Sequence, residues 1–142
     1  MNKLRDKKLG TLVGLAVGDA MGAPYEFLAK GRYTPTKEYN TGGVHNVSIG
    51  EWTDDTSMAL CLAQSLIDSS GFNVIDQMEK YLKWYRLGYM STRNVCFDIG
   101  NATRNAICEF ENSNHTIPYT RTGAYQTNGN GSIMRLAPIP ML

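Results

Sequence analysis

Apolar residues recur at steps of three and four along most of the chain, which is the spacing of amphipathic helices. This spacing predicts a first helix over residues 5–21 and a second that starts at the pair Thr53-Asp54 and stops before Ser69-Ser70-Gly71. A third helix is predicted to follow a capping Asn73 and to stop at Gly88. A fourth is predicted to open around Asp98, which then stands in its first turn.

The first predicted helix carries glycine at every fourth position of one face. These glycines are Gly10, Gly14, Gly18 and Gly22. Glycine costs up to about 1 kcal/mol per helix position relative to alanine, so the repetition needs a structural reason. The simplest reason is the close approach of another backbone. Near the end of this helix, Asp19 is most simply a polar cap and Glu26 a solvated loop acid.

The segment from Ala29 to Glu51 has no sustained hydrophobic period and is rich in glycine and polar residues. Irregular connections of this length are uncommon in compact domains, and many of them cover or line a functional site. We therefore expect this loop to cover or line a site. Its His45 would be a tempting ligand or base, but a lone loop histidine is more often incidental, so His45 is not included in the predicted site.

The stretch Trp52-Thr53-Asp54-Asp55-Thr56 joins that loop to the second helix. Two adjacent carboxylates repel one another, and they are tolerated where a helix N-terminus or a cation offsets their charge. One interpretation is helix capping, with Thr53 or Asp54 as the N-cap. The other is a site for a hard cation, because Thr and Asp oxygens are ligands that Mg²⁺ prefers. The two interpretations are compatible, since a helix N-terminus holds its cap residues rigidly.

A glycine-rich segment near the C-terminus reads Thr127-Asn128-Gly129-Asn130-Gly131-Ser132-Ile133-Met134-Arg135. A loop of this kind that leads into a helix suits phosphate binding by backbone N–H groups. It matches neither the dinucleotide nor the P-loop fingerprint, so the signal is weak by itself. A hairpin at the two Asn-Gly pairs is the weaker alternative, because no alternating strands flank them.

The composition narrows the classes of partner. The 142 residues are enough for one domain with a core, and the net charge of +1 favours neither nucleic acid nor an anionic membrane. An aromatic stripe on the third helix is expected to pack in the core, because few basic residues interleave with it. Its members are Tyr81, Trp84, Tyr85 and Tyr89. The three cysteines form no C-x-x-C pair and indicate buried free thiols in a reducing cytoplasm.

Four segments, in this order and at these intervals, resemble the ADP-ribosylglycohydrolase family. They are Gly-Asp-Ala-x-Gly-x-x-x-Glu at 18–26, Trp-Thr-Asp-Asp-Thr at 52–56, Phe-Asp-Ile-Gly at 97–100 and Asn-Gly-Ser-x-Met-Arg at 130–135. The Phe-Asp-Ile-Gly segment is similar to the arginine-directed branch, which includes the dinitrogenase reductase-activating glycohydrolase. Any one segment could arise by chance, but the four together are specific and extend over nearly the whole chain.

The resemblance implies an all-α helical bundle with a binuclear Mg²⁺ or Mn²⁺ centre at the base of an ADP-ribose cleft. The implied reaction is hydrolysis of the N-glycosidic bond between ADP-ribose and an arginine side chain of a modified protein. By matching positions, Thr53, Asp54 and Asp55 would be metal ligands, with Asp55 and Glu26 also acting in catalysis. Asp98 would hold the departing guanidinium. Asn130, Gly131, Ser132 and Met134 would bind ADP-ribose, and Arg135 would be nearer to a structural role.

The chain departs from the family in one respect. A further metal-binding segment of the Asp-x-Asp-Thr type, on C-terminal helices that complete the bundle, has no match here. The 142 residues are therefore expected to be an incomplete domain, completed by a C-terminal half or second chain, or inactive. Two alternatives to an active hydrolase follow. One is a non-catalytic ADP-ribose-binding, immunity or regulatory module. The other is a helical domain whose acids only cap helices.

Overall fold

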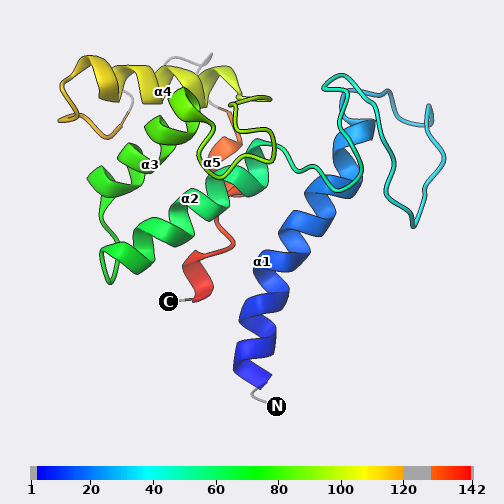
Figure 1. The fold of residues 1–142 in the computed structure, drawn as a ribbon, viewed down its shortest axis with the longest axis horizontal. Coiled ribbons are helices and arrows are strands. Elements are labelled where there is room, and N and C mark those ends of the chain that lie inside the picture. The colour runs from blue at the N-terminus through cyan, green and yellow to red at the C-terminus, as the bar shows by residue number, and fades with distance from the viewer. Residues whose placement is uncertain (1–2, 120–128, 142) are drawn as a thin grey trace.

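The computed structural model describes residues 3–119 and 129–141. Its helices are α1 (Lys3–Gly22), α2 (Asp54–Asp68), α3 (Val74–Leu87), α4 (Asn101–Asn112) and the short α5 (Gly131–Met134), with 3-10 turns η1 (Ala23–Tyr25) and η3 (Ile139–Met141) (Figure 1). Within the described residues, extended pairing is limited to one bridge between Gly42 and Val47. The all-α class is confirmed.

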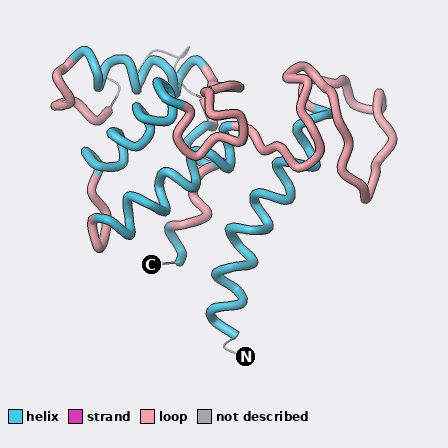
Figure 2. The backbone as a smooth tube through the Cα atoms, in the orientation of Figure 1, coloured by secondary structure: helices cyan, strands magenta, loops and turns pink. Residues whose placement is uncertain are grey.

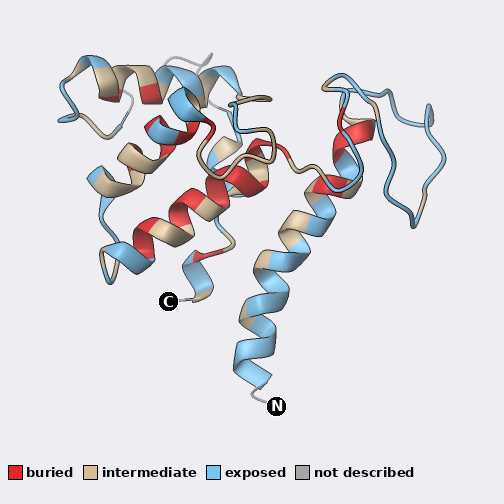
Figure 3. Ribbon diagram, in the orientation of Figure 1, coloured by how far each residue is buried: buried red, intermediate tan, exposed pale blue. Residues whose placement is uncertain are grey.

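Helices α2, α3 and α4 pack together and hold the hydrophobic core (Figures 1 and 3). The core residues are Met58, Cys61, Leu62, Leu66, Met78, Tyr81, Leu82, Trp84, Ile107 and Phe110. Local chemistry sets the ends of α3. The Asn73 side chain accepts hydrogen bonds from the N–H groups of Ile75 and Asp76, and Gly88 closes the helix in a left-handed conformation. Two aromatic residues of the predicted stripe, Tyr81 and Trp84, lie in this core, as expected from the sequence.

Helix α1 stands apart from that core over most of its length (Figure 1). Ala20 is its one buried residue, and Leu9 and Val13 are 52% and 56% exposed. The expected close approach of a backbone along the glycine face is wrong for the described chain. A Cβ atom built on any of the four glycines of this face meets nothing within 4 Å. Helix α1 packs on α2 and η1 near its C-terminal end, while at its other end the Lys8 amino group donates to the carbonyl of Met141.

The expected position of Asp98 in the first turn of the fourth helix is also wrong. Helix α4 begins at Asn101 with Gly100 as its N-cap residue. Asp98 lies in the preceding loop with a φ of 57°, a left-handed conformation that cannot continue a right-handed helix. Its carboxylate is therefore not a helix cap. This backbone turn instead brings it to the segment that follows α1.

The long connection between η1 and α2 forms an irregular excursion beyond the end of α1 (Figure 2). It returns to η1 at Gly43, whose φ is +70° and where a Cβ would lie 2.7 Å from the Pro24 carbonyl oxygen. Val47, close behind in the chain, is 2% exposed. The loop is thus anchored beside the residues that follow α1.

No helix within the described ranges combines the length and the apolar character needed to cross a bilayer. All three cysteines are free thiols, of which Cys61 is buried and Cys96 and Cys108 are half-buried.

Candidate functional site

A carboxylate from α1 caps the start of α2. Asp19 accepts hydrogen bonds from the backbone N–H of Thr53 at 3.0 and 3.1 Å and from the Thr53 hydroxyl at 2.9 Å. It also accepts from the N–H of Thr56 at 3.0 Å and from its hydroxyl at 2.6 Å. Thr53 occupies the N-cap position, as one interpretation of the sequence expected, but its own side chain makes no capping bond. The capping oxygens come from Asp19, a role that the sequence analysis described only as a generic cap.

Because Asp19 satisfies the helix end, the paired acids of α2 are available for another purpose. Asp54 and Asp55 line a cavity of about 620 Å³, together with Glu26 and Asp98. These carboxylates come from three separate segments: the residue after η1, the first turn of α2, and the loop before α4. The cavity lies within the size range of small-ligand sites. The structure thus brings together the acids that the sequence predicted for the site.

Burial, and then the charges of neighbouring acids, raise the pKa values of Glu26, Asp54 and Asp55. Burial, and then the neighbouring charges of Asp98, Asp55 and Asp19, raise the pKa of Asp54 to about 8. Burial, then a side-chain hydrogen bond with Asp98 and the charges of Asp98, Asp55 and Asp19, raise the pKa of Glu26 to about 8. Burial and the charges of Asp19 and Asp98 raise the pKa of Asp55 to about 6. Raised pKa values in several carboxylates of one cavity are typical of a functional site.

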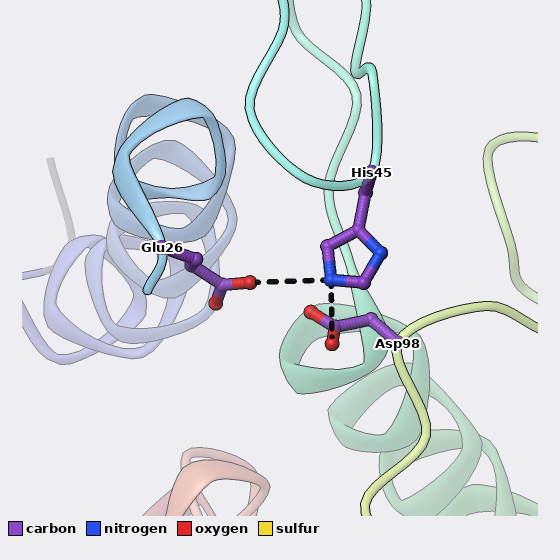
Figure 4. Close-up of side chains that lie close together, drawn as sticks. All are labelled: Glu26, His45 and Asp98. Carbon is purple, nitrogen blue, oxygen red and sulfur yellow. Dashed lines mark ion pairs between the residues drawn. The ribbon is translucent and has the colours of Figure 1, made fainter. Parts of the chain in front are cut away.

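His45, which the sequence analysis left outside the site, belongs to the acidic cluster. Its Nε2 atom lies 2.8 Å from Asp98 Oδ1 and 3.6 Å from Glu26 Oε2 (Figure 4). Both distances are within ion-pair range. Neither His45 Nε2 nor Glu26 Oε2 has a hydrogen-bond partner. The length of the loop that carries His45 was the one signal in the sequence that pointed here.

The glycine-rich segment lines the same cavity as the acids. Asn130, Gly131 and Met134 line the same cavity, whereas Ser132 lines a smaller neighbouring one of about 230 Å³ that shares Gly131. Gly131 lies against α4, and a Cβ there would be 2.8 Å from the Thr103 hydroxyl oxygen. The predicted helix start after this loop is confirmed as α5, while Thr127 and Asn128 lie outside the described residues.

Arg135 points toward the core and away from the acids. Its guanidinium lies 4.8 Å from the centre of the Tyr81 ring, and Nη1 lies 3.8 Å from the Met58 sulfur. Tyr81 and Met58 are both buried core residues. This is the geometry of a packing contact, in line with the structural role that the resemblance implied.

The side chains at and beside this cavity have the ligand atoms that a divalent cation requires. Glu26, His45 and Asp98 each offer one ligand atom, and these atoms lie within 4.8 Å of one another. Asp54 and Asp55 add carboxylates at the same cavity, and the buried Glu26 Oε2 has no hydrogen-bond partner. Thr53 is 1% exposed, and its hydroxyl proton goes to Asp19, which leaves the oxygen lone pairs for a cation.

These features define an all-α fold with an acidic cavity at the start of α2 that is also lined by a glycine-containing loop. A family model described as ADP-ribosylglycohydrolase matches residues 1–142. The chain therefore belongs to the ADP-ribosylglycohydrolase family, as the resemblance of its motifs indicated.

Individual relatives give a more detailed comparison. The chain is 44% identical to "ADP-ribosylarginine hydrolase Tri1" of Serratia proteamaculans, over 94% of this chain and 36% of that protein. It is 36% identical to "ADP-ribosyl-[dinitrogen reductase] glycohydrolase" of Rhodospirillum rubrum, over 95% of this chain and 44% of that protein. A solved structure described as an ADP-ribosylglycohydrolase-related protein complex matches with a TM-score of 0.77 at 42% identity, over 98% of this chain and 43% of that one. The chain thus spans less than half the length of these relatives.

Proposed function

We propose that these residues form the acidic part of the active site of an ADP-ribosyl-arginine hydrolase. The observation that carries the proposal is one cavity lined by Glu26, Asp54, Asp55 and Asp98 and closed on another side by the segment that includes Gly131. The names of the Serratia and Rhodospirillum relatives, an ADP-ribosylarginine hydrolase and an ADP-ribosyl-[dinitrogen reductase] glycohydrolase, support the reaction class.

Asp98 is proposed to bind the arginine side chain. In the reaction, the bond between the anomeric carbon of ribose and a guanidino nitrogen breaks, a water oxygen bonds to that carbon, and the departing guanidine takes up a proton. A carboxylate beside a guanidinium orients it through charge-assisted hydrogen bonds. The Asp98 carboxylate lies at the cavity wall and is only 14% exposed, so such a bond would be shielded from solvent.

Thr53, Asp54 and Asp55 are proposed to hold Mg²⁺ or Mn²⁺ as part of a binuclear centre. When bound, such ions orient ribose hydroxyls and lower the pKa of water. Glu26 stands beside these residues at the cavity wall, where its carboxylate can take the proton of the attacking water or gate the cleft. The remaining ligands, of the Asp-x-Asp-Thr type, are proposed to come from a C-terminal half or a second chain.

The loop from Asn130 to Met134 is proposed to bind the ADP-ribose. Backbone N–H groups in a glycine-rich turn can surround a phosphate, which gives affinity away from the reacting carbon. Gly131 lies close to Thr103 of α4 and lines the cavity, so the loop is beside the acids that would meet the ribose.

The test uses a chimera in which this chain replaces the matching 36% of the Serratia relative. The chimera with Mg²⁺ should release ADP-ribose from an arginine-modified protein, and the parent protein is the positive control. A folded chimera that releases none, beside an active parent, would refute the proposal.

Calorimetry on the 142-residue chain separates the remaining alternatives. A metal-assisted site should bind ADP-ribose more tightly with Mg²⁺ present. Equal affinity with and without Mg²⁺, combined with an inactive chimera, would favour a binding module. If neither ADP-ribose nor Mg²⁺ gives heat of binding or raises the melting temperature, the result would favour a helical domain whose acids are structural.

A further inference from the structure

We propose that His45 is a positioning residue, which holds the Asp98 carboxylate from behind in the orientation that receives the substrate guanidinium. The inference rests on the proposed function. His45 Nε2 is 2.8 Å from Asp98 Oδ1 and 3.6 Å from Glu26 Oε2, so one imidazole lies between two carboxylates of the site (Figure 4). None of the four segments that carry the family resemblance contains His45.

The cavity geometry separates positioning from a direct role in binding. Asp98 and Glu26 both line the cavity of about 620 Å³, whereas His45 is not among its lining residues. The imidazole therefore contacts the two acids without itself lining the cavity. A guanidinium that enters the cavity would meet Asp98 with one oxygen already held by His45. The remaining lone pairs of the carboxylate then point to the substrate.

Asp98 needs such support because its own backbone does not provide it. The residue lies in a loop with a φ of 57°, in the left-handed region that aspartate visits as a single residue. It precedes α4 and takes no part in that helix. Contacts with other segments therefore hold its carboxyl group: the His45 imidazole at ion-pair distance and the Glu26 carboxyl group.

Arg93 in turn fastens the loop that carries His45. Its guanidinium donates to the backbone carbonyls of His45 at 2.9 Å and Asn46 at 3.0 Å, and to Glu51 Oε2 at 2.7 Å. It also stacks on Phe97, next to Asp98 in sequence, 4.3 Å from the ring centre. Arg93 thus joins the loop before α2 to the loop before α4, and it sets the distance from His45 to Asp98.

Spectroscopy on the chain tests the contact itself, whatever the activity. The sequence has two histidines, so the imidazole ¹⁵N resonances of His45 can be assigned against those of His115. Asp98→Asn should shift the His45 resonances and leave those of His115 unchanged, because His115 pairs with Glu79 on α3. Unchanged His45 resonances in folded D98N protein would overturn the proposal.

Kinetics in the chimera test the consequence for function. His45→Ala should lower kcat/KM for an ADP-ribosylated arginine substrate by about 10- to 100-fold, the usual cost of misplacing a reacting group. The inhibition constant of free ADP-ribose, which lacks the guanidinium, should stay within about twofold. His45→Gln, which keeps a polar side chain at this position, should recover part of the loss, and His115→Ala is the matched control.

A double-variant cycle then tests whether Arg93 acts through His45. Arg93→Ala alone should reproduce part of the H45A loss, and the double variant should be no worse than H45A. Additive losses would overturn the role of Arg93.

For His45, an unchanged kcat/KM in an active chimera would overturn the proposal, as would an equal loss of ADP-ribose affinity. Loss of Mg²⁺ heat in H45A would also overturn it, because His45 would then be a ligand. An inactive wild-type chimera would count against the proposed function, and the ¹⁵N resonances would still decide the contact.

Discussion

Removal of the Asp19 carboxylate should strongly destabilise this chain. Asp19→Ala leaves four donors without their acceptor: the N–H and hydroxyl groups of Thr53 and Thr56. These residues are 1% and 2% exposed, so water reaches the freed groups poorly. An unsatisfied buried donor costs about 1–3 kcal/mol, and a lost helix cap costs about 0.5–2 kcal/mol. With the two backbone N–H groups as the main cost, we expect the free energy of unfolding to fall by about 2–5 kcal/mol.

Urea unfolding followed by far-UV circular dichroism measures this loss. Asp19→Asn keeps one carbonyl acceptor and should cost about half as much as the alanine variant. The matched control is Asp6→Ala, which removes an exposed acid from the same helix and should cost less than about 1 kcal/mol. If D19A and D6A unfold at the same urea concentration, the hydrogen bonds to α2 contribute little and the reasoning is refuted.

Four more predictions follow, three from the cavity and one from the glycine face of α1. Asp55→Asn in the chimera should abolish ADP-ribose release in the hydrolysis assay while the circular dichroism spectrum is unchanged. Gly131→Ala should weaken ADP-ribose binding at least about tenfold in calorimetry, since its Cβ would lie 2.8 Å from a hydroxyl oxygen. In contrast, a Cβ added at Gly14 meets nothing within 4 Å. Gly14→Ala should therefore raise the free energy of unfolding by about 0.4–1 kcal/mol in urea unfolding. Burial raises the pKa of Glu26 and Asp54 to about 8, so the folded metal-free protein binds more protons than the unfolded chain. Its melting temperature should therefore fall as pH rises from about 5 to 8, and saturating Mg²⁺ should reduce that slope; a flat metal-free profile would contradict these shifts.

The sequence predicted those features that depend on neighbours along the chain. Asn73 and Gly88 delimit α3 because capping is decided within a few residues. The start of α4 was misplaced, because an aspartate suits both the first turn of a helix and the left-handed conformation that Asp98 adopts. The exposed glycine face of α1 was misjudged for a related reason. The spacing shows that one face of the helix carries only small residues, but it cannot show which segment, if any, packs on that face.

The candidate site was predictable where its residues form motifs, and not where tertiary contacts alone define a role. Asp54 and Asp55 stand out because two adjacent acids precede an apolar helix. Asp19 acts on residues 34 and 37 positions away, so no local pattern could assign its acceptor role. His45 is likewise a single histidine whose meaning depends on the fold bringing it to Asp98.

The core alone cannot set the geometry of this site. The buried cluster is drawn from α2, α3 and α4, yet Glu26 follows α1 and η1, which contribute no residue to that cluster. Asp98 also lies outside any helix. Two sets of polar contacts therefore position the acids of the site. Asp19 joins α1 to the start of α2, and Arg93 with His45 joins the loop before α2 to the loop before α4. Because hydrogen-bonded networks of this kind are lost when one member is removed, substitutions there should impair the site while the core of α2, α3 and α4 stays packed.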